Sequence, residues 1–233
     1  MALETLVILV CFGVSLIALL GFSGLLLEAA FIEGGQDRKT AYRIIAGLFA
    51  WAFVAFSAGY WVEMNFAVFA PFALIPILAG TALTFTPSVK RLLAAIPVHR
   101  LVFLQTYRMA GLIFVIVYVW SGELTRGFAM NAGWGDVLTG ALAIPVGWML
   151  WRGVRWAGPA LIVWSVIGIG DLLVAPASAQ IYGAGGLTAF PLNTIPLFLG
   201  PPFGILMHVV TLRIWRLSAE RAAGGGVAVA HSA

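Results

Sequence analysis

Residues 6–27 read LVILVCFGVSLIALLGFSGLLL, an apolar run without a single charged side chain. A helix of this length, rising about 1.5 Å per residue, spans the roughly 30 Å hydrocarbon core of a bilayer. Six further apolar stretches follow it, so that the full set comprises residues 6–27, 44–62, 66–85, 101–120, 136–151, 156–176 and 189–212. The fifth stretch is short, and its helix is expected to extend back to about Ala132, near a membrane surface. These stretches predict an all-α fold, a polytopic transmembrane bundle of about seven helices.

The composition supports a bilayer as the main solvent of the chain. Of its 233 residues, 62% are hydrophobic and 9% are charged, whereas soluble domains carry about 25% charged residues. A transmembrane bundle accounts for residues 1–217, and the small residues of 218–233 predict a disordered cytoplasmic tail. The net charge of +4 is expected to face lipid headgroups, which makes the bilayer, and not nucleic acid, the partner.

The distribution of positive charge predicts the orientation of the bundle. Eleven of the 13 Lys and Arg residues fall in alternate loops or at the C-terminal end, and the opposite loops hold only Arg126. Because basic residues concentrate on the cytoplasmic side, we expect the N-terminus outside and the C-terminus inside. The residues on the predicted inner side are Arg38, Lys39, Arg43, Lys90, Arg91, Arg100, Arg152, Arg155, Arg213, Arg216 and Arg221.

Three segments carry further expectations. The first apolar run follows a start without Lys or Arg, which predicts a retained helix and not a cleaved signal peptide. Residues 87–97, PSVKRLLAAIP, are typical of a short basic amphipathic helix on the cytoplasmic surface. The last apolar stretch contains Pro191, Pro196, Pro201 and Pro202, so that irregular or re-entrant backbone is expected there.

Ionisable side chains inside apolar helices are costly and therefore mark candidate sites. Arg108 lies roughly 10 Å from the predicted cytoplasmic start of its helix, and Gln105, three residues earlier, shares its face. Together they offer a cation and an amide to a small anionic or carbonyl-bearing ligand. The alternative is an arginine that reaches back to the cytoplasmic surface or clamps backbone carbonyls.

Two aspartates extend this predicted site. Asp171, in the outer half of its helix, is interpreted as a proton-relay group, as a partner of Arg108, or as a carboxylate bonded to backbone near a helix end. The expected depths of Asp171 and Arg108 differ by roughly 10 Å, so that direct pairing needs an offset or a bridge. Asp136, which follows a GWG sequence, is typical of a helix N-cap. Its functional alternative is an outer vestibule shared with Asp171.

His208 is the only histidine inside an apolar stretch, at about the expected depth of Arg108. It either joins an inner site, with Glu28 nearby, or packs as a polar residue against a neighbouring helix. A single axial histidine argues against haem, and Lys39 and Lys90 lie in loops, where they cannot form a retinal Schiff base. With Cys11 as the only cysteine, we expect no disulfide within the chain, no metal and no cofactor.

Catalysis is a minor alternative. Gly21-Phe22-Ser23-Gly24 matches the GxSG pattern of intramembrane serine hydrolases, and His208 offers a base. The motif falls in the first helix, where small residues also serve close helix packing. No oxyanion partner is recognisable around it, and we expect a protein without covalent chemistry.

Four motifs mark the second half of the chain: IPVHRLVFLQTYRMAGLIF (96–114), FAMNAGWGDVLTGALA (128–143), GDLLVA (170–175) and LMHVVTLRIW (206–215). On these motifs, the stretch from Pro97 to Arg216 resembles a family of small bacterial multi-pass membrane proteins with no established activity. The resemblance implies a place in the bacterial inner membrane. It puts all five polar candidates in recognisable motifs, but it implies no substrate.

The leading interpretation is a bundle that binds or translocates a small solute or ion through an internal polar site. The second interpretation is a structural or accessory subunit, or an assembly helper, that contacts a membrane-protein partner. The third is the intramembrane serine hydrolase. The predicted site residues are Gln105, Arg108, Asp136, Asp171 and His208.

Overall fold

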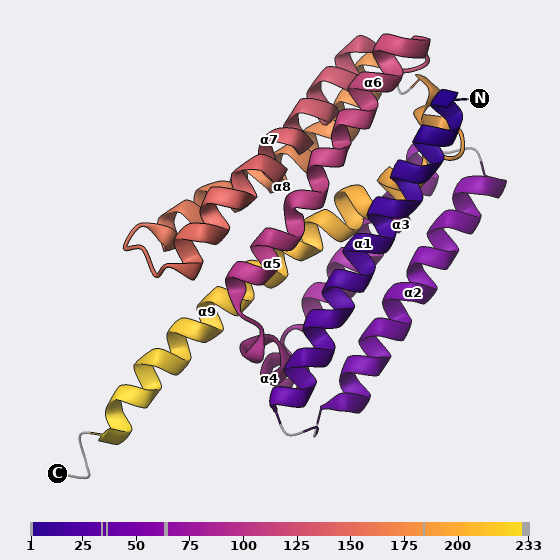
Figure 1. Cartoon of the computed structure of the whole chain (residues 1–233). Coiled ribbons are helices and arrows are strands. Elements are labelled where there is room, and N and C mark those ends of the chain that lie inside the picture. Colours follow the sequence, from indigo (N-terminus) through magenta and orange to yellow (C-terminus); the bar gives the residue numbers. More distant parts are fainter. Residues whose placement is uncertain (1, 34, 36, 63–64, 184, 230–233) are drawn as a thin grey trace.

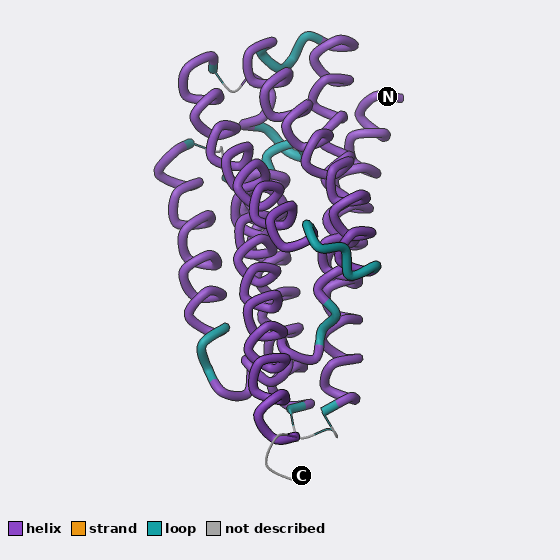
Figure 2. Tube along the Cα trace, turned by 90° about the vertical axis from the view of Figure 1, so that its left-hand side faces the viewer, coloured by secondary structure: helices purple, strands orange, loops and turns teal. Residues whose placement is uncertain are grey.

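The computed structural model describes residues 2–33, 35, 37–62, 65–183 and 185–229, and these ranges contain helices and loops but no strand (Figure 2). The all-α prediction is confirmed. The long helices are α1 (Ala2–Ile32), α2 (Arg38–Trp61), α3 (Phe66–Leu83), α7 (Arg126–Trp151), α8 (Ala157–Tyr182) and α9 (Gly204–Val229). The shorter elements are α4 (Pro87–Ala95), α5 (Val98–Leu104), η1 (Gln105–Gly111), α6 (Leu112–Ser121), η2 (Gly185–Thr188) and η3 (Ile195–Phe203).

Successive long segments run in opposite directions, and the two termini lie at opposite ends of the bundle (Figure 1). We name these ends the N-terminal end and the C-terminal end. Three elements, α5, η1 and α6, continue one another as the single segment Val98–Ser121. At the C-terminal end, α3 turns through 88° into α4, which occupies most of the range predicted for a short amphipathic helix.

Within the described ranges, five helical segments are long and apolar enough to cross a membrane, namely Leu3–Ile32, Arg38–Trp61, Val98–Ser121, Ala157–Tyr182 and Ile195–Glu220. The bent pair of α3 and α4 adds a sixth if it is counted as one span. The 26-residue helix α7 has the length but is not among the five. Its composition is less apolar, because it contains Asn131, Asp136 and several glycines.

Two helices extend beyond the apolar stretches that predicted them. α7 begins at Arg126, before both the apolar stretch that starts at Asp136 and its expected extension back to about Ala132, and the amide of Ala129 already donates to the carbonyl of Thr125. Polar residues interrupt an apolar pattern without interrupting backbone hydrogen bonding, so the pattern understated this helix. α8 likewise continues past Pro176 to Tyr182.

The irregular backbone that the prolines predicted is confirmed. η3 is a π-helix in which Gly200 has non-helical dihedral angles, φ −70° and ψ −117°. Pro201 and Pro202 follow at once, and neither has an amide proton to continue the helical hydrogen bonds. The last span is therefore broken at Gly200, and its regular part starts at Gly204 as α9.

The C-terminal residues differ from the predicted disordered tail at 218–233. α9 continues to Val229, so the backbone of residues 218–229 is helical, and residues 230–233 lie outside the described ranges. Extending an existing helix costs little, because each added residue gains a hydrogen bond once the helix has been nucleated. The small residues of the tail did not reveal this continuation of α9.

Burial differs strongly between the spans. The segment formed by η3 and α9 lies at the centre of the bundle, where Phe198, Met207 and Ile214 are fully buried. α2 stands at the edge (Figure 1), and its Phe53 and Trp61 are exposed. The polar candidates belong to the enclosed side of the bundle, around α7, α8 and α9.

Candidate functional site

Arg108 lies in the middle of the segment Val98–Ser121, where the α-helix changes to the 3-10 geometry of η1. A 3-10 helix rises about 2.0 Å per residue, against about 1.5 Å in an α-helix. The change therefore moves Arg108 farther from the C-terminal end than a regular helix would. Its side chain is only 2% exposed, so the guanidinium is enclosed by the protein and does not reach a surface.

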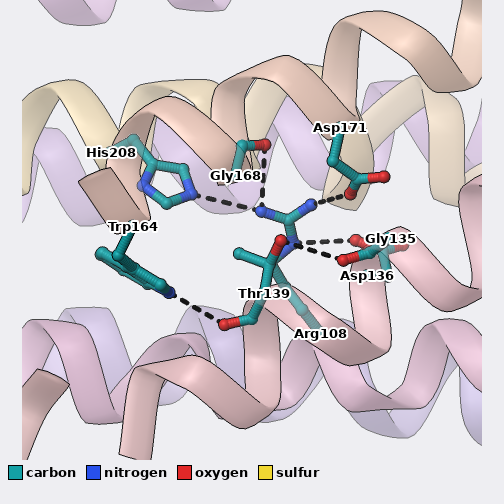
Figure 3. Close-up of polar contacts among 8 residues, drawn as sticks. All are labelled: Arg108, Gly135, Asp136, Thr139, Trp164, Gly168, Asp171 and His208. Atoms are coloured by element: carbon teal, nitrogen blue, oxygen red, sulfur yellow. Dashed lines mark hydrogen bonds and ion pairs between the residues drawn. The ribbon is translucent and has the colours of Figure 1, made fainter. Parts of the chain in front are cut away.

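All three guanidinium nitrogens of Arg108 have partners (Figure 3). Nε donates to Oδ1 of Asp136 at 2.8 Å, and Nη2 donates to Oδ2 of Asp171 at 2.5 Å. Nη1 donates to the carbonyl oxygen of Gly168 at 3.3 Å and lies 3.2 Å from Nε2 of His208. We call Arg108, Asp136, Asp171 and His208 the buried ion network. It joins four segments of the chain, η1, α7, α8 and α9.

The two aspartates do not lie where the sequence patterns put them. Asp136 is inside α7, which begins at Arg126, so the N-cap interpretation is wrong. Asp171 is near the middle of α8, because that helix runs on to Tyr182. Together with the longer rise of η1, this brings Asp171 to the depth of Arg108, and the expected offset of roughly 10 Å disappears.

The hydrogen bond to His208 fixes the tautomer of its ring. A guanidinium can only donate, so Nε2 must accept from Arg108, which puts the proton of a neutral imidazole on Nδ1. The ring packs against Trp164, with 4.5 Å between centroids. Trp164 in turn donates from Nε1 to the carbonyl of Thr139 at 2.9 Å. His208 therefore packs against a neighbouring helix, as its structural interpretation expected, and it also belongs to the candidate site.

Glycines allow the helices to close around the buried ion network. A Cβ atom added to Gly168 would overlap the His208 ring, and one added to Gly135 would overlap the Asp171 carboxylate. A Cβ at Gly111 would collide with Asp136 in the same way. The sequence patterns did not identify these glycines as part of the site, although Gly135 directly precedes Asp136 and a GxxD pattern, starting at Gly168, ends at Asp171.

Several buried polar atoms beside the network lack a partner among the described residues. Both the Nε2 and the Oε1 atoms of Gln105 are unpaired, as are Oγ of Ser165 and Nδ1 of His208. Gln105 is fully buried, and among the described residues its amide makes no hydrogen bond, to Arg108 or to any other group. Each unpaired buried polar group lowers the stability of the fold by about 1–3 kcal/mol. Several such groups in one place make this region unusually polar for its burial.

Two cavities adjoin the buried ion network. The larger, of about 90 Å³, is lined by Asp136 and Asp171, and a smaller one of about 30 Å³ is lined by Arg108 and Asp136. They share part of their wall, including Asp136 and the helix break at Gly200. The larger cavity has the volume of several water molecules, although most of its lining is apolar and its charged groups are the two aspartates. Both carboxylates line the larger cavity, whereas Arg108 lines only the smaller one.

Two further sequence-based expectations fail geometrically. Oγ of Ser23 has no hydrogen-bond partner within the described chain, and Nε2 of His208 is directed at Arg108. A serine nucleophile and its base would need to be within hydrogen-bond reach of each other. Glu28 does not join the inner site either, since it is bonded to Arg100 at 2.5 Å in an exposed position.

The charges of the buried ion network do not cancel when both carboxylates are ionised. One guanidinium faces two carboxylates and a neutral imidazole, which leaves one net negative charge. An uncompensated charge in a low-dielectric interior is expensive. Such a site can take up a proton or another small cation. Among the described residues, no group of three or more His, Cys, Asp or Glu side chains is placed to hold a metal ion, and this includes the two carboxylates and the imidazole of the network.

These features define an all-helical protein with membrane-length apolar helices and an arginine buried between two carboxylates. The chain belongs to the family described as a domain of unknown function, DUF8737, whose model matches residues 65–216. The match covers all five candidate residues and the segments that carry them, and it leaves out α1 and α2. No curated protein and no solved structure matches the chain.

Proposed function

We propose that this protein binds and translocates a small ion, with a proton as the first candidate, through the buried ion network. The observation that carries the proposal is the pairing of one guanidinium with two carboxylates, at 2.8 Å and 2.5 Å, inside a bundle of apolar helices. Ionisable residues in such a setting commonly belong to ion pathways and proton relays. The uncompensated negative charge favours a cation.

The same contacts argue against an anionic ligand on Arg108. Its Nε and Nη2 atoms are bonded to carboxylates, and Nη1 is bonded to Gly168 and faces His208. An anion would have to displace one of these carboxylates, which would then lie buried without a cation. We therefore narrow the expected small anionic or polar ligand to a small cation.

Unequal surroundings on the two sides of Arg108 support a route through the site. Toward the N-terminal end, the 90 Å³ cavity leads from the carboxylates to Asn65, Gln180 and Thr188. In the other direction lie the unpaired polar atoms of Gln105 and Ser165. Gln105 precedes Arg108 in the segment Val98–Ser121, and Ser165 precedes Asp171 in α8. Both segments run from the C-terminal end toward the N-terminal end, so these atoms lie on the C-terminal side of the network. A proton or ion bound at Asp171 would thus have water-sized space on one side and unpaired donors and acceptors on the other.

The proposal includes a topology of seven crossings for residues 1–217, with the N-terminus outside and the C-terminus in the cytoplasm of a bacterial inner membrane. Its support is the alternating direction of the segments, with α7 running beside α8 (Figure 1), and the excess of Lys and Arg at the C-terminal end. In a Cys11→Ser background, Arg155→Cys should react only with a membrane-permeant maleimide and Glu123→Cys also with an impermeant one. The reverse pattern would contradict this orientation.

The functional test uses purified protein in liposomes that enclose a pH-sensitive dye, with a potassium diffusion potential as the driving force. We expect proton flux above that of protein-free liposomes and its loss in Asp171→Asn. Asp37→Asn is the matched control, because Asp37 is also bonded to an arginine, Arg91, but far from the site. Uptake of ²²Na⁺ in the same liposomes distinguishes a sodium pathway from a proton pathway.

Asp171→Asn is expected to stay folded, because Asp136 would still neutralise Arg108. A variant that loses flux but retains its unfolding temperature supports the proposal. Equal flux in Asp171→Asn and the wild type would overturn it, and so would a wild type that moves neither protons nor sodium.

One observation favours the second candidate, a structural or accessory subunit. The buried ion network ties η1, α7, α8 and α9 together with every guanidinium nitrogen in use, as a purely structural clamp would. In that case the wild type would be inactive in liposomes, and a membrane-protein partner would copurify in fixed stoichiometry.

A further inference from the structure

A third cavity, separate from the two beside the buried ion network, opens between α2 and α3. It measures about 560 Å³, within the range of roughly 300–1,000 Å³ that ligand sites occupy. Ile44 and Leu48 of α2 face Ile75 of α3 across it, and Met207 of α9 contributes to its wall. We call it the lipid-side cavity, because α2 and α3 are at the periphery of the bundle, where the hydrocarbon of a membrane would meet it.

The cavity has one deep apolar end and one polar end. Trp51, in the middle of α2, lines the deep part, and Arg43 lines the part nearer the C-terminal end. Eight helical residues separate them, or about 12 Å. This is close to half of the roughly 30 Å hydrocarbon core, so the cavity has the depth of one leaflet.

The polar end carries positive charge that the protein does not neutralise. Arg43 is exposed and forms no ion pair with any described residue. Thr86, Pro87 and Ser88, at the start of α4, line the same end, and no side chain caps that helix. Uncapped amides at a helix N-terminus favour anions such as phosphate. A cation and a helix N-terminus thus meet at the mouth of an apolar cavity.

We infer that the lipid-side cavity binds one acyl chain of an anionic glycerophospholipid, whose phosphate lies between Arg43 and the first turn of α4. Three observations support this occupant: the apolar walls, the one-leaflet depth and the unneutralised charge at the leaflet surface. A protein interior normally packs to high density without voids of this size. The inference does not depend on ion translocation by the buried ion network.

Binding can be measured by fluorescence quenching in mixed detergent micelles. Phosphatidylglycerol with a dibrominated acyl chain is titrated into wild type and into Trp51→Phe, and the difference between the two isolates the signal of Trp51. Phosphatidylcholine with the same chain is the headgroup control. We expect saturable quenching of Trp51 with a clearly lower midpoint for phosphatidylglycerol.

Filling the cavity should abolish this quenching. Gly47 lines the cavity, and a Cβ atom there would meet nothing within 4 Å, so Gly47→Phe is expected to direct its ring into the cavity. Gly24→Phe is the matched control, since Gly24 is a helical glycine with equally open surroundings in α1. Unfolding temperatures check that both variants are folded. Unchanged quenching of Trp51 in Gly47→Phe would overturn the inference.

The headgroup contact has its own pair of variants. Arg43→Gln should raise the midpoint for phosphatidylglycerol about fivefold, the effect of one basic residue at an anionic surface, and leave phosphatidylcholine unchanged. Lys39→Gln removes an equal charge from the first turn of α2, outside the cavity, and should have a smaller effect. Equal midpoints for the two lipids in the wild type would reduce the cavity to an unspecific lipid contact and overturn the headgroup assignment.

Discussion

Around Arg108, η1, α7 and α8 come so close that glycine is required at Gly111, Gly135 and Gly168, whereas between α2 and α3 the same bundle leaves a cavity of about 560 Å³. The difference follows from the type of interaction. Ion pairs and hydrogen bonds hold their atoms at 2.5–3.3 Å, which fixes helix positions. Apolar contact is non-directional, and in a membrane a lipid chain satisfies it as well as a side chain does.

The largest difference between the two regions should appear when their arginines are removed. Arg108→Ala leaves two buried carboxylates without a cation, and breaking a buried pair in this way costs about 3–5 kcal/mol. For a chain of this size we expect the unfolding temperature in a mild detergent to fall by roughly 10 °C. Arg43→Ala should change the free energy of unfolding by no more than about 0.5 kcal/mol.

A triple variant sharpens this comparison. Arg108→Met combined with Asp136→Asn and Asp171→Asn removes all three charges, so it should recover much of the stability that Arg108→Ala loses. If the triple variant is no more stable than Arg108→Ala, uncompensated charge is not the cause of the loss.

Glycine substitutions test the packing itself. Gly168→Ala should cost about 1–3 kcal/mol, because its methyl group overlaps the His208 ring. Gly170→Ala, two residues further along α8, and Gly47→Ala in the lipid-side cavity meet nothing within 4 Å. Both should be neutral or stabilising by up to about 1 kcal/mol, since alanine favours helix. The measurement is the unfolding temperature of the three variants. Equal changes in all three would contradict the difference in packing between the two regions.

Gln105→Leu separates stability from function in the tightly packed region. Because both amide atoms of Gln105 are buried and unpaired, an apolar side chain of similar size should raise the free energy of unfolding by roughly 1–2 kcal/mol. The same change should reduce proton flux in liposomes if the amide serves the route. A destabilised Gln105→Leu would show that the amide has a structural partner.

The smallest effect is expected at Asp37, which Arg91 holds with two hydrogen bonds of 2.9 Å at the C-terminal end. These bonds lower the pKa of the Asp37 carboxyl. The pair therefore stabilises the fold above the unfolded-state pKa of about 3.9, and this contribution is lost as the pH falls through the folded-state pKa. Solvent around the half-exposed Arg91 weakens the pair.

The measurement is the difference in unfolding temperature between wild type and Asp37→Asn as a function of pH. The difference should be constant from about pH 7 to pH 5 and should narrow below about pH 4. A difference that persists unchanged into strong acid would show that the ionic form of Asp37 contributes nothing.

The sequence predicted the helical architecture because apolar length and backbone pairing in a membrane allow few alternatives. It also predicted the broken last span, since Pro201 and Pro202 cannot continue a helix. It misjudged the start of α7, where Asn131 and Asp136 shortened the apolar run although the helix continues through them. Helix limits that depend on polar residues facing the interior cannot be read from hydropathy alone.

For the candidate site, the sequence identified the charged residues but not their geometry. Arg108 and Asp171 were expected at different depths, because neither the 3-10 turn at Arg108 nor the full length of α8 has a clear sequence signal. Gly135 and Gly168, which permit the close approach, were not recognised as part of the site. Small residues next to an intramembrane aspartate are the signal that could have revealed them.

The order of the network along the chain has a consequence for how the protein is made. Arg108 precedes Asp136 by 28 residues, Asp171 by 63 and His208 by 100. During synthesis from the N-terminus, the arginine reaches the membrane before either acidic partner has left the ribosome. The turn between α6 and α7 is short, which would allow the two segments to enter the lipid together as a hairpin with Arg108 already neutralised by Asp136. Biogenesis therefore favours Asp136 as the first counter-ion and leaves Asp171 to arrive second, at an occupied guanidinium.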